Sequence, residues 1–186
     1  QTLDKNDVKI LTESVFEFFR SNKPFESFQL KSGIDYFNEN EISHLNDVRI
    51  LLNRIMLAFY ISAGLFIIVL IFLADKKYLF FLRNIAVIFV ISTSAMLFFL
   101  ISLYILGNNF SGLFKNFHLV FFPQGNWAFP EDALIINIFP FGFFYDFFFR
   151  LLSSSFFVSL FLLAFSVPVL VISNKLISKK ISCQKE

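Results

Sequence analysis

The large-scale pattern of this chain is three long apolar runs separated by segments of mixed polarity. The runs cover residues 55–74, 85–106 and 151–172, and none of them contains a charged residue. A helix of about 20 apolar residues is long enough to cross the hydrocarbon core of a bilayer. The pattern therefore predicts an integral membrane protein with three transmembrane helices. Pro168 lies in the last run, and a spanning helix tolerates such a residue as a kink.

The segment before the first run, residues 1–54, has the pattern of a small folded domain. Apolar residues recur at helical spacing over 4–20, which predicts an amphipathic helix. Residues 25–37 alternate as a strand does, with a turn at Ser32-Gly33, and this is typical of a hairpin. We therefore expect a mainly α protein that carries a small extracytoplasmic α+β domain.

A second helix is predicted to begin near Asn38. Asn38 is a good N-cap residue, and Glu41 follows three residues later as its capping-box partner. The apolar positions after it continue at helical spacing into the run 55–74. The pattern thus predicts one long helix that extends the first span into the preceding domain.

Residues 134–149 are apolar but do not fit a fourth span in this chain. The segment is short, is interrupted by Pro140 and Gly142, and contains Asp146. We expect it to be an interfacial or re-entrant segment with its aromatic side chains at headgroup depth.

The distribution of basic residues predicts the orientation in the membrane. The loop 75–84 and the tail 173–186 together hold 7 of the 16 Lys and Arg residues, so both are expected to be cytoplasmic. Residues 1–54 and 107–150, the latter with a polar motif at 117–130, then both face the outside. Both segments that carry histidines, His44 in the first and His118 in the second, are therefore expected on the extracytoplasmic face of the membrane.

The start of the chain leads to a further expectation. The first residue is Gln1, and 54 residues precede the first span on the outer side. Such a segment is difficult to insert unaided, so we expect an upstream membrane helix or a cleaved signal. An upstream helix would bring the number of spans to four.

Composition excludes several classes of protein. The chain is 56% hydrophobic, far from the range of ordinary soluble domains, and its net charge of +2 gives no reason to expect a nucleic-acid partner. The single cysteine, Cys183, cannot form an internal disulfide, and its predicted cytoplasmic position separates it from the outer segments.

The candidate chemistry lies in two histidines that the topology places on the same side. Glu41, His44 and Asp47 lie at i, i+3 and i+6 of the predicted helix, so either carboxylate could hold an imidazole nitrogen of His44. The same residues could equally form a solvated polar face. His118 stands in the motif 117–130 as a second candidate base.

The rest of that motif offers groups that could stabilise an oxyanion. Gly125 supplies backbone N–H, Asn126 an amide and Trp127 an indole N–H. Trp127 could instead be an interfacial anchor. A zinc site would need both histidines and one of the carboxylates, and neither a paired-histidine spacing nor an outer cysteine supports it, so we assign no metal. The absence of a Gly-x-Ser-x-Gly motif disfavours a serine hydrolase.

A set of motif residues resembles one bacterial family over most of the chain, from the outer helix through the last span. The residues that carry the resemblance are Glu41, His44, Asp47, Phe117, His118, Phe121, Phe122, Asn126, Trp127, Phe129, Asp132, Leu134, Ile135, Phe139, Pro140, Phe144 and Asp146. The chain is similar to the lipoprotein intramolecular transacylases. It departs from the family pattern at Asn126 and Phe144, where Thr and Trp are usual.

The resemblance implies an acyl shift within one lipoprotein molecule. The sn-2 acyl chain of the diacylglyceryl-cysteine would move to the cysteine α-amine, giving the lyso form without ATP or any other cofactor. His118 would be the general base, and His44 a second acid/base oriented by Glu41 or Asp47. Gly125, Asn126 and Trp127, and more remotely Asp132 and Asp146, would support or position the reacting groups.

The expected partners are a diacylated lipoprotein substrate and membrane lipids. Two alternatives belong to other classes. One is a non-enzymatic membrane accessory or lipid-binding protein, in which both histidines could be replaced with little effect. The other is a zinc-dependent membrane hydrolase, which a chelator would silence.

Overall fold

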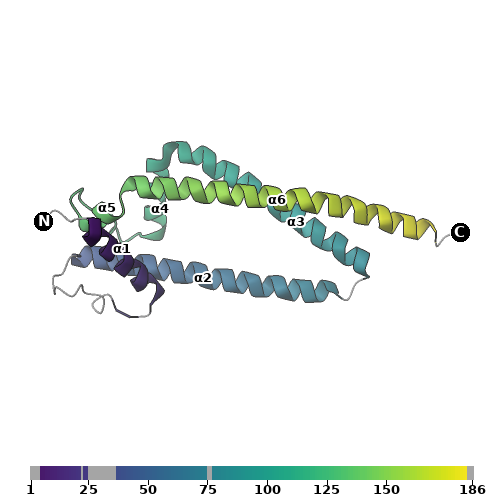
Figure 1. Ribbon diagram of the computed structural model, residues 1–186, viewed down its shortest axis with the longest axis horizontal. Helices are drawn as coiled ribbons and strands as arrows, with labels where there is room; N and C mark the ends of the chain where they lie inside the picture. The colour runs from purple at the N-terminus through teal and green to yellow at the C-terminus, as the bar shows by residue number, and fades with distance from the viewer. Residues whose placement is uncertain (1–4, 22, 25–36, 75–76, 184–186) are drawn as a thin grey trace. The chain divides into compact units, whose positions relative to one another are not determined.

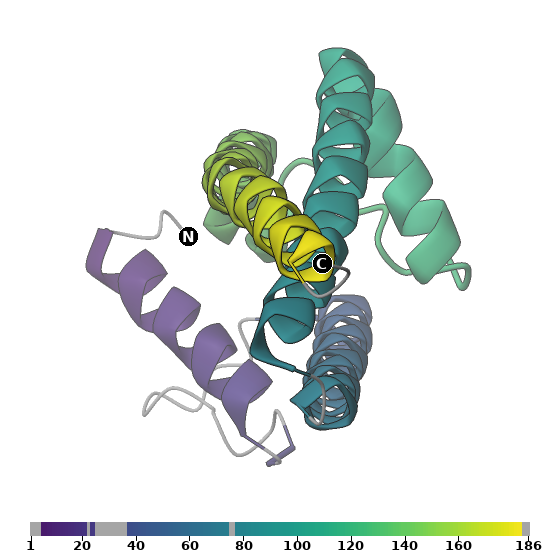
Figure 2. The same cartoon turned by 90° about the vertical axis from the view of Figure 1, so that its right-hand side faces the viewer.

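The computed structural model describes residues 5–21, 23–24, 37–74 and 77–183, and all of its regular structure is helical (Figures 1 and 2). The described residues contain no strand, so the expected α+β domain is not supported. The predicted hairpin lies outside the described residues except for Phe37. The helices are α1 (Lys5–Arg20), α2 (Glu39–Ala74), α3 (Tyr78–Leu106), a 3₁₀ turn (Gly107–Asn109), α4 (Phe110–Phe121), α5 (Leu134–Ile138) and α6 (Phe141–Ser182).

Three helical stretches are long and apolar enough to cross a membrane, as Figure 1 lets the reader follow along the chain. They are α2, the stretch Tyr78–Phe121 and α6. Each contains one of the apolar runs, which confirms the prediction of three such helices. Most large apolar side chains in the runs are exposed, as expected of helices whose solvent is lipid.

The chain divides into two compact units, which are described separately. The first consists of Gln1–Tyr60 and Ser111–Asp146, and the second of Ile61–Phe110 and Phe147–Glu186. All of the candidate site residues fall in the first unit. The described residues of the first unit therefore surround the candidate site.

The core of the first unit is built on the apolar face of α1. Leu11, Val15 and Phe18, spaced three or four residues apart, are almost completely buried. They belong to one cluster with Leu45 of α2 and Ile135 of α5. Burying a side chain of this size stabilises the fold by about 1.5–3 kcal/mol. The predicted amphipathic helix is thus confirmed, with its end at Arg20.

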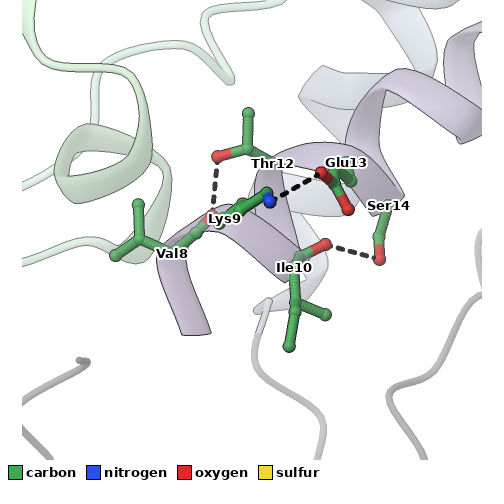
Figure 3. Close-up of polar contacts among 6 residues, drawn as sticks. All are labelled: Val8, Lys9, Ile10, Thr12, Glu13 and Ser14. Atoms are coloured by element: carbon green, nitrogen blue, oxygen red, sulfur yellow. Dashed lines mark hydrogen bonds and ion pairs between the residues drawn. The ribbon is translucent and has the colours of Figure 1, made fainter. Parts of the chain in front are cut away.

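The other face of α1 carries polar groups that are satisfied locally, as Figure 3 shows. Thr12 Oγ1 donates to the Val8 carbonyl at 2.7 Å, and Ser14 Oγ donates to the Ile10 carbonyl at 2.9 Å. Lys9 and Glu13 form an ion pair at 3.9 Å, but both side chains are mostly exposed. A pair of this kind contributes little to stability.

The start of α2 follows the predicted capping box. The Glu41 N–H donates to Asn38 Oδ1 at 3.0 Å, and the Asn38 N–H donates to Glu41 Oε2 at 2.8 Å. The other carboxylate oxygen, Oε1, accepts the Ile135 N–H at 3.0 Å. Because Glu41 is only 1% exposed, this carboxylate is a buried link between the start of α2 and α5.

Residues 134–149 divide between two helices that meet at Pro140. Leu134–Ile138 is a single short helix, and α6 begins directly after Pro140, so residues 141–149 belong to the longest helix of the chain. Proline is well tolerated at a helix start because the first N–H groups have no intrahelical partner. Gly142 does not interrupt the helix. The sequence signal for a break was therefore correct at Pro140 and wrong at Gly142.

The second unit contains a regular pattern of burial. Buried residues recur every seven positions on α3, at Ala86, Thr93 and Leu100. They recur at the same interval on α6, at Leu152, Ser159, Ser166 and Ser173. A repeat of seven keeps one narrow face of a helix directed at its neighbours.

Thr93 and Ser166 on these faces donate their hydroxyl groups within their own helices. Thr93 donates to the Phe89 carbonyl at 2.6 Å, and Ser166 donates to the Leu162 carbonyl at 2.7 Å. In an apolar medium such internal bonds remove the cost of an unpaired hydroxyl.

Candidate active site

His44 lies on the second turn of α2 and is buried among aromatic rings. Its imidazole meets Phe122 edge-on with ring centroids 4.9 Å apart, and Phe129 at 5.5 Å. The side chain is 7% exposed. Its Nδ1 has no hydrogen-bond partner among the described residues. The buried face of α2 that includes Glu41 and Leu45 places the ring here, since positions i, i+3 and i+4 share one side of a helix.

His118 lies in the last turn of α4, a helix that the sequence pattern did not predict. Its Nδ1 is 2.7 Å from the carbonyl oxygen of Phe114, one turn earlier. A carbonyl only accepts, so Nδ1 carries the proton, and the lone pair of the neutral ring is on Nε2. Phe114 and Trp127 cover the ring at centroid distances of 4.2 and 4.9 Å.

The two imidazoles are neighbours. Their ring centroids are 6.0 Å apart and their planes are 28° from parallel. The rings come from sequence positions 74 residues apart (118 − 44), on two helices of the first unit. The sequence predicted that both histidines lie on one side of the membrane, but it gave no means of predicting this contact.

Burial keeps both rings neutral near pH 7. It lowers the pKa of His44 to about 4, an effect that His118 reinforces and the Asp47 carboxylate opposes. Burial also lowers the pKa of His118 from its usual 6.5, against the opposing effect of the hydrogen bond to the Phe114 carbonyl. Both residues lie outside the three apolar runs. Each ring can therefore accept a proton without first losing one.

Asp47 binds the loop after α4 rather than the imidazole Nδ1 of His44. Its Oδ2 accepts from Gln124 Nε2 at 2.6 Å and from Asn126 Nδ2 at 2.7 Å. Asn126 Nδ2 also donates to Ser43 Oγ at 3.1 Å. These bonds attach the loop to α2 over the turn that carries His44.

Gly125 and Trp127 give this loop its shape and its chemistry. Gly125 has φ +80°, a conformation that residues with a Cβ adopt only at a cost, and its N–H donates to the Phe122 carbonyl at 3.1 Å. Trp127 Nε1 is buried without a hydrogen-bond partner among the described residues. Its N–H is thus a donor available beside His118, whereas the N–H of Gly125 is already used.

A family model described as lipoprotein intramolecular transacylase Lit matches residues 1–144 of this chain. The chain belongs to the Lit family. The match contains both histidines and the loop, and it ends before most of α6, so it is shorter than the resemblance through the last span. No curated protein and no solved structure matches the chain. Membership of the Lit family implies an acyltransferase that acts on lipoproteins.

Other predicted site residues of this Lit-family chain lie apart from the imidazole pair. Both oxygens of Glu41 bind backbone N–H groups, so the carboxylate is engaged in the fold. Asp132 and Asp146 are exposed, and neither is among the groups that shift the pKa of His44 or of His118. No group of three or more His, Cys, Asp or Glu side chains in the described part of the chain could hold a metal ion.

Sequence reasoning gave no role to Gln124 and Ser43, which help to hold the Lit-family loop. It named Phe122 and Phe129 but did not predict that their rings contact His44. The spacing of two amides on either side of Gly125 was the available signal. Their shared acceptor, Asp47, lies 79 residues before Asn126, so the contact could not be read from local spacing.

Proposed function

We propose that the paired histidines catalyse an O-to-N acyl shift within one bacterial lipoprotein molecule. The sn-2 acyl chain leaves the glycerol of the diacylglyceryl-cysteine and joins the α-amine of the same cysteine. The observation that carries the proposal is a neutral His118, held in one tautomer by the Phe114 carbonyl, stacked beside a neutral His44. Family membership supports the class of reaction.

In the proposed reaction the substrate supplies its own nucleophile. The amine nitrogen attacks the ester carbonyl carbon, and a C–N bond forms. His118 Nε2 takes the proton from the attacking nitrogen and returns it to the glycerol oxygen as the C–O bond breaks. Proton and acyl group both remain within the substrate, so the reaction is an isomerisation that needs no external reactant.

A weak base is sufficient for this proton transfer. Once the amine has added to the carbonyl, its nitrogen is cationic and far more acidic than a free ammonium group. A buried imidazole with a lowered pKa can accept that proton and readily release it to the departing alkoxide. His44 offers a second imidazole nitrogen to share or relay the proton.

The tetrahedral intermediate carries a negative oxygen, and Trp127 is the donor best suited to it. Its Nε1–H is buried and unpartnered among the described residues, with its ring 4.9 Å from that of His118. A donor that is positioned before the charge develops stabilises the transition state without further reorganisation. Holding the amine and ester of one molecule together supplies much of the remaining rate enhancement.

The membrane setting fits a lipid-modified substrate. Three helices are long and apolar enough to span, and the distribution of basic residues favours an extracytoplasmic position for both histidines. We therefore propose a multi-pass protein of the cytoplasmic membrane whose site receives the ester at the outer interface.

Mass spectrometry of a diacylated model lipopeptide tests the proposal. Wild-type protein in detergent is expected to leave the total mass unchanged while fragment ions show one acyl chain on the amine. His118→Ala is expected to lose this conversion, and Asn137→Ala, which alters an exposed residue of the same unit, to retain it. Loss of a fatty acid from the lipopeptide would indicate a hydrolase. A lipopeptide left unchanged by wild type and by the variants would refute the proposal.

A further inference from the structure

The amide of Asn126 is held in one orientation. Its Nδ2 donates to Asp47 Oδ2 at 2.7 Å and to Ser43 Oγ at 3.1 Å. These bonds use the nitrogen, so the amide oxygen Oδ1 is directed away from Asp47 and Ser43. That oxygen is buried and has no hydrogen-bond partner among the described residues. A buried acceptor without a partner is costly, and in a native site it calls for a ligand or another explanation.

The Asn126 oxygen is one of three such atoms in the described chain, and the other two belong to His44 and Trp127. His44 is more than nine-tenths buried, its ring stacks on that of His118, and the His118 ring contacts Trp127. Asn126 precedes Trp127 and donates to Ser43 and Asp47, which lie on either side of His44 in α2, so the three residues belong to one site. They differ in chemistry: the indole N–H only donates, the amide oxygen only accepts, and the imidazole nitrogen does one or the other.

We propose that Asn126 Oδ1 is the subsite for the primary α-amine of the substrate, supported from behind by the Asp47 carboxylate. This inference deepens the proposed function and rests on it. An amine presents N–H donors, which the amide oxygen can accept and the Trp127 N–H cannot. The ester oxygen presents only acceptors, which suit Trp127. The neighbouring residues Asn126 and Trp127 thus receive the two reacting ends of the substrate.

Charge gives the amine end its specificity. Asp47 accepts two amide donors, and its negative charge polarises the Asn126 amide so that Oδ1 becomes a better acceptor. A free amine, with two or three N–H groups and a positive charge when protonated, gains from this potential. An N-acylated cysteine has one N–H and no charge, so the site favours substrate over product.

Binding of ligands that cannot react separates this inference from the acyl transfer itself. Two dialkylglyceryl-cysteine peptides with ether-linked chains, one with a free amine and one N-acetylated, are titrated into detergent-solubilised protein. Trp127 is the only tryptophan of the chain, so its emission reports binding at the site. Wild type is expected to bind the free amine about tenfold more tightly than the N-acetyl peptide, the factor for roughly one hydrogen bond to a polarised acceptor.

Asn126→Leu is close in size and lacks the acceptor, so the ratio of the two affinities is expected to fall to about one, mainly through weaker binding of the free amine. Asp47→Asn removes the charge and is expected to reduce the ratio in the same direction, and Asn137→Ala to leave it unchanged. The thermal unfolding midpoint identifies any variant that does not fold, and Asp47→Asn then provides the test. A preference for the free amine that survives in both Asn126→Leu and Asp47→Asn overturns the inference.

An acyl-transfer assay of wild type with the diester peptide distinguishes the amine subsite from the proposed acyl shift. If wild type transfers the acyl chain of the diester peptide while the folded variants keep the preference for the free amine, only the amine subsite is refuted. Selective, Asn126-dependent binding of the free amine without any transfer refutes the proposed function and retains the amine site.

Discussion

Glu41 is the residue whose replacement is expected to weaken the first unit most, because its buried carboxylate joins two segments distant in sequence. It accepts the Asn38 N–H at 2.8 Å and the Ile135 N–H at 3.0 Å. A hydrogen bond to a charged group contributes about 1.5–3 kcal/mol. Loss of both in Glu41→Ala should therefore lower the free energy of unfolding by at least about 3 kcal/mol. It also leaves the Ile135 N–H unpaired in the core.

The assay is thermal unfolding of the purified chain in detergent, followed by the emission of Trp127. For a chain of this size, 3 kcal/mol corresponds to a fall in Tm of roughly 6–12 °C. Asn38→Ala is the matched control, because it removes the cap but leaves the bond to Ile135, and it should cost only about 1 kcal/mol. Glu41→Gln retains one acceptor oxygen and should lie between the two.

The competing account of Glu41 is that it orients His44, as its spacing in the sequence allowed. That account predicts a normal Tm and an altered pH dependence of activity in Glu41→Gln. If Glu41→Ala melts with the wild type, or if Glu41→Gln shifts only the pH profile, the structural link is refuted.

Four further predictions concern the two histidines, the loop after α4 and the surface of α1. The emission of Trp127 should be quenched when the neighbouring His118 becomes protonated. The midpoint of this pH titration should lie below pH 6.5, and the titration should be absent in His118→Asn. A midpoint at or above 6.5 would contradict the lowering of the His118 pKa by burial. The lowered pKa of His44 means that the unfolded chain binds more protons, so thermal stability should fall as pH decreases from 6.5 towards 4, and His44→Gln should reduce that dependence. Gly125→Ala meets no atom within 4 Å but requires φ +80°, so it should cost about 1–2 kcal/mol of strain, measured as a lower Tm; an unchanged Tm would show that the loop relaxes freely. Lys9→Ala breaks only an exposed ion pair and should leave Tm within about 2 °C of the wild type, and a larger fall would give that pair an unexpected role.

The parts of the fold that the sequence predicted are those set by local patterns. The three apolar runs, the amphipathic face of α1 and the capping box at Asn38 and Glu41 each depend on residues within a few turns. α4 was not predicted because residues 107–150 were expected to be an extracytoplasmic or interfacial segment and Pro123 indicated a loop. Its residues Phe110–Phe121 nevertheless contain no proline and continue the helical stretch from α3.

The residue types of the candidate site could be predicted from the sequence, but their hydrogen-bond partners could not. Spacing put Glu41, His44 and Asp47 close to one stripe of α2, but it could not tell which polar group each would bind. Glu41 binds a backbone N–H 94 residues away, and Asp47 binds an amide 79 residues away. Contacts over such separations depend on how the helices pack, which no local spacing contains.

The placement of the two histidines would explain how the proposed site, although it lies among aromatic rings, moves a proton. A charged imidazole is unfavourable there, and burial accordingly lowers the pKa of both rings. In the proposed isomerisation no proton has to stay on the enzyme, because the amine releases one and the glycerol oxygen takes one up. A base that holds the proton only briefly releases it readily in an environment that disfavours its charged form. This requires that the imidazolium cation and the substrate oxyanion exist at the same time. The stacked pair and the Trp127 N–H meet that condition, since the positive charge on an imidazole and the negative charge on the substrate oxygen would arise side by side and stabilise each other.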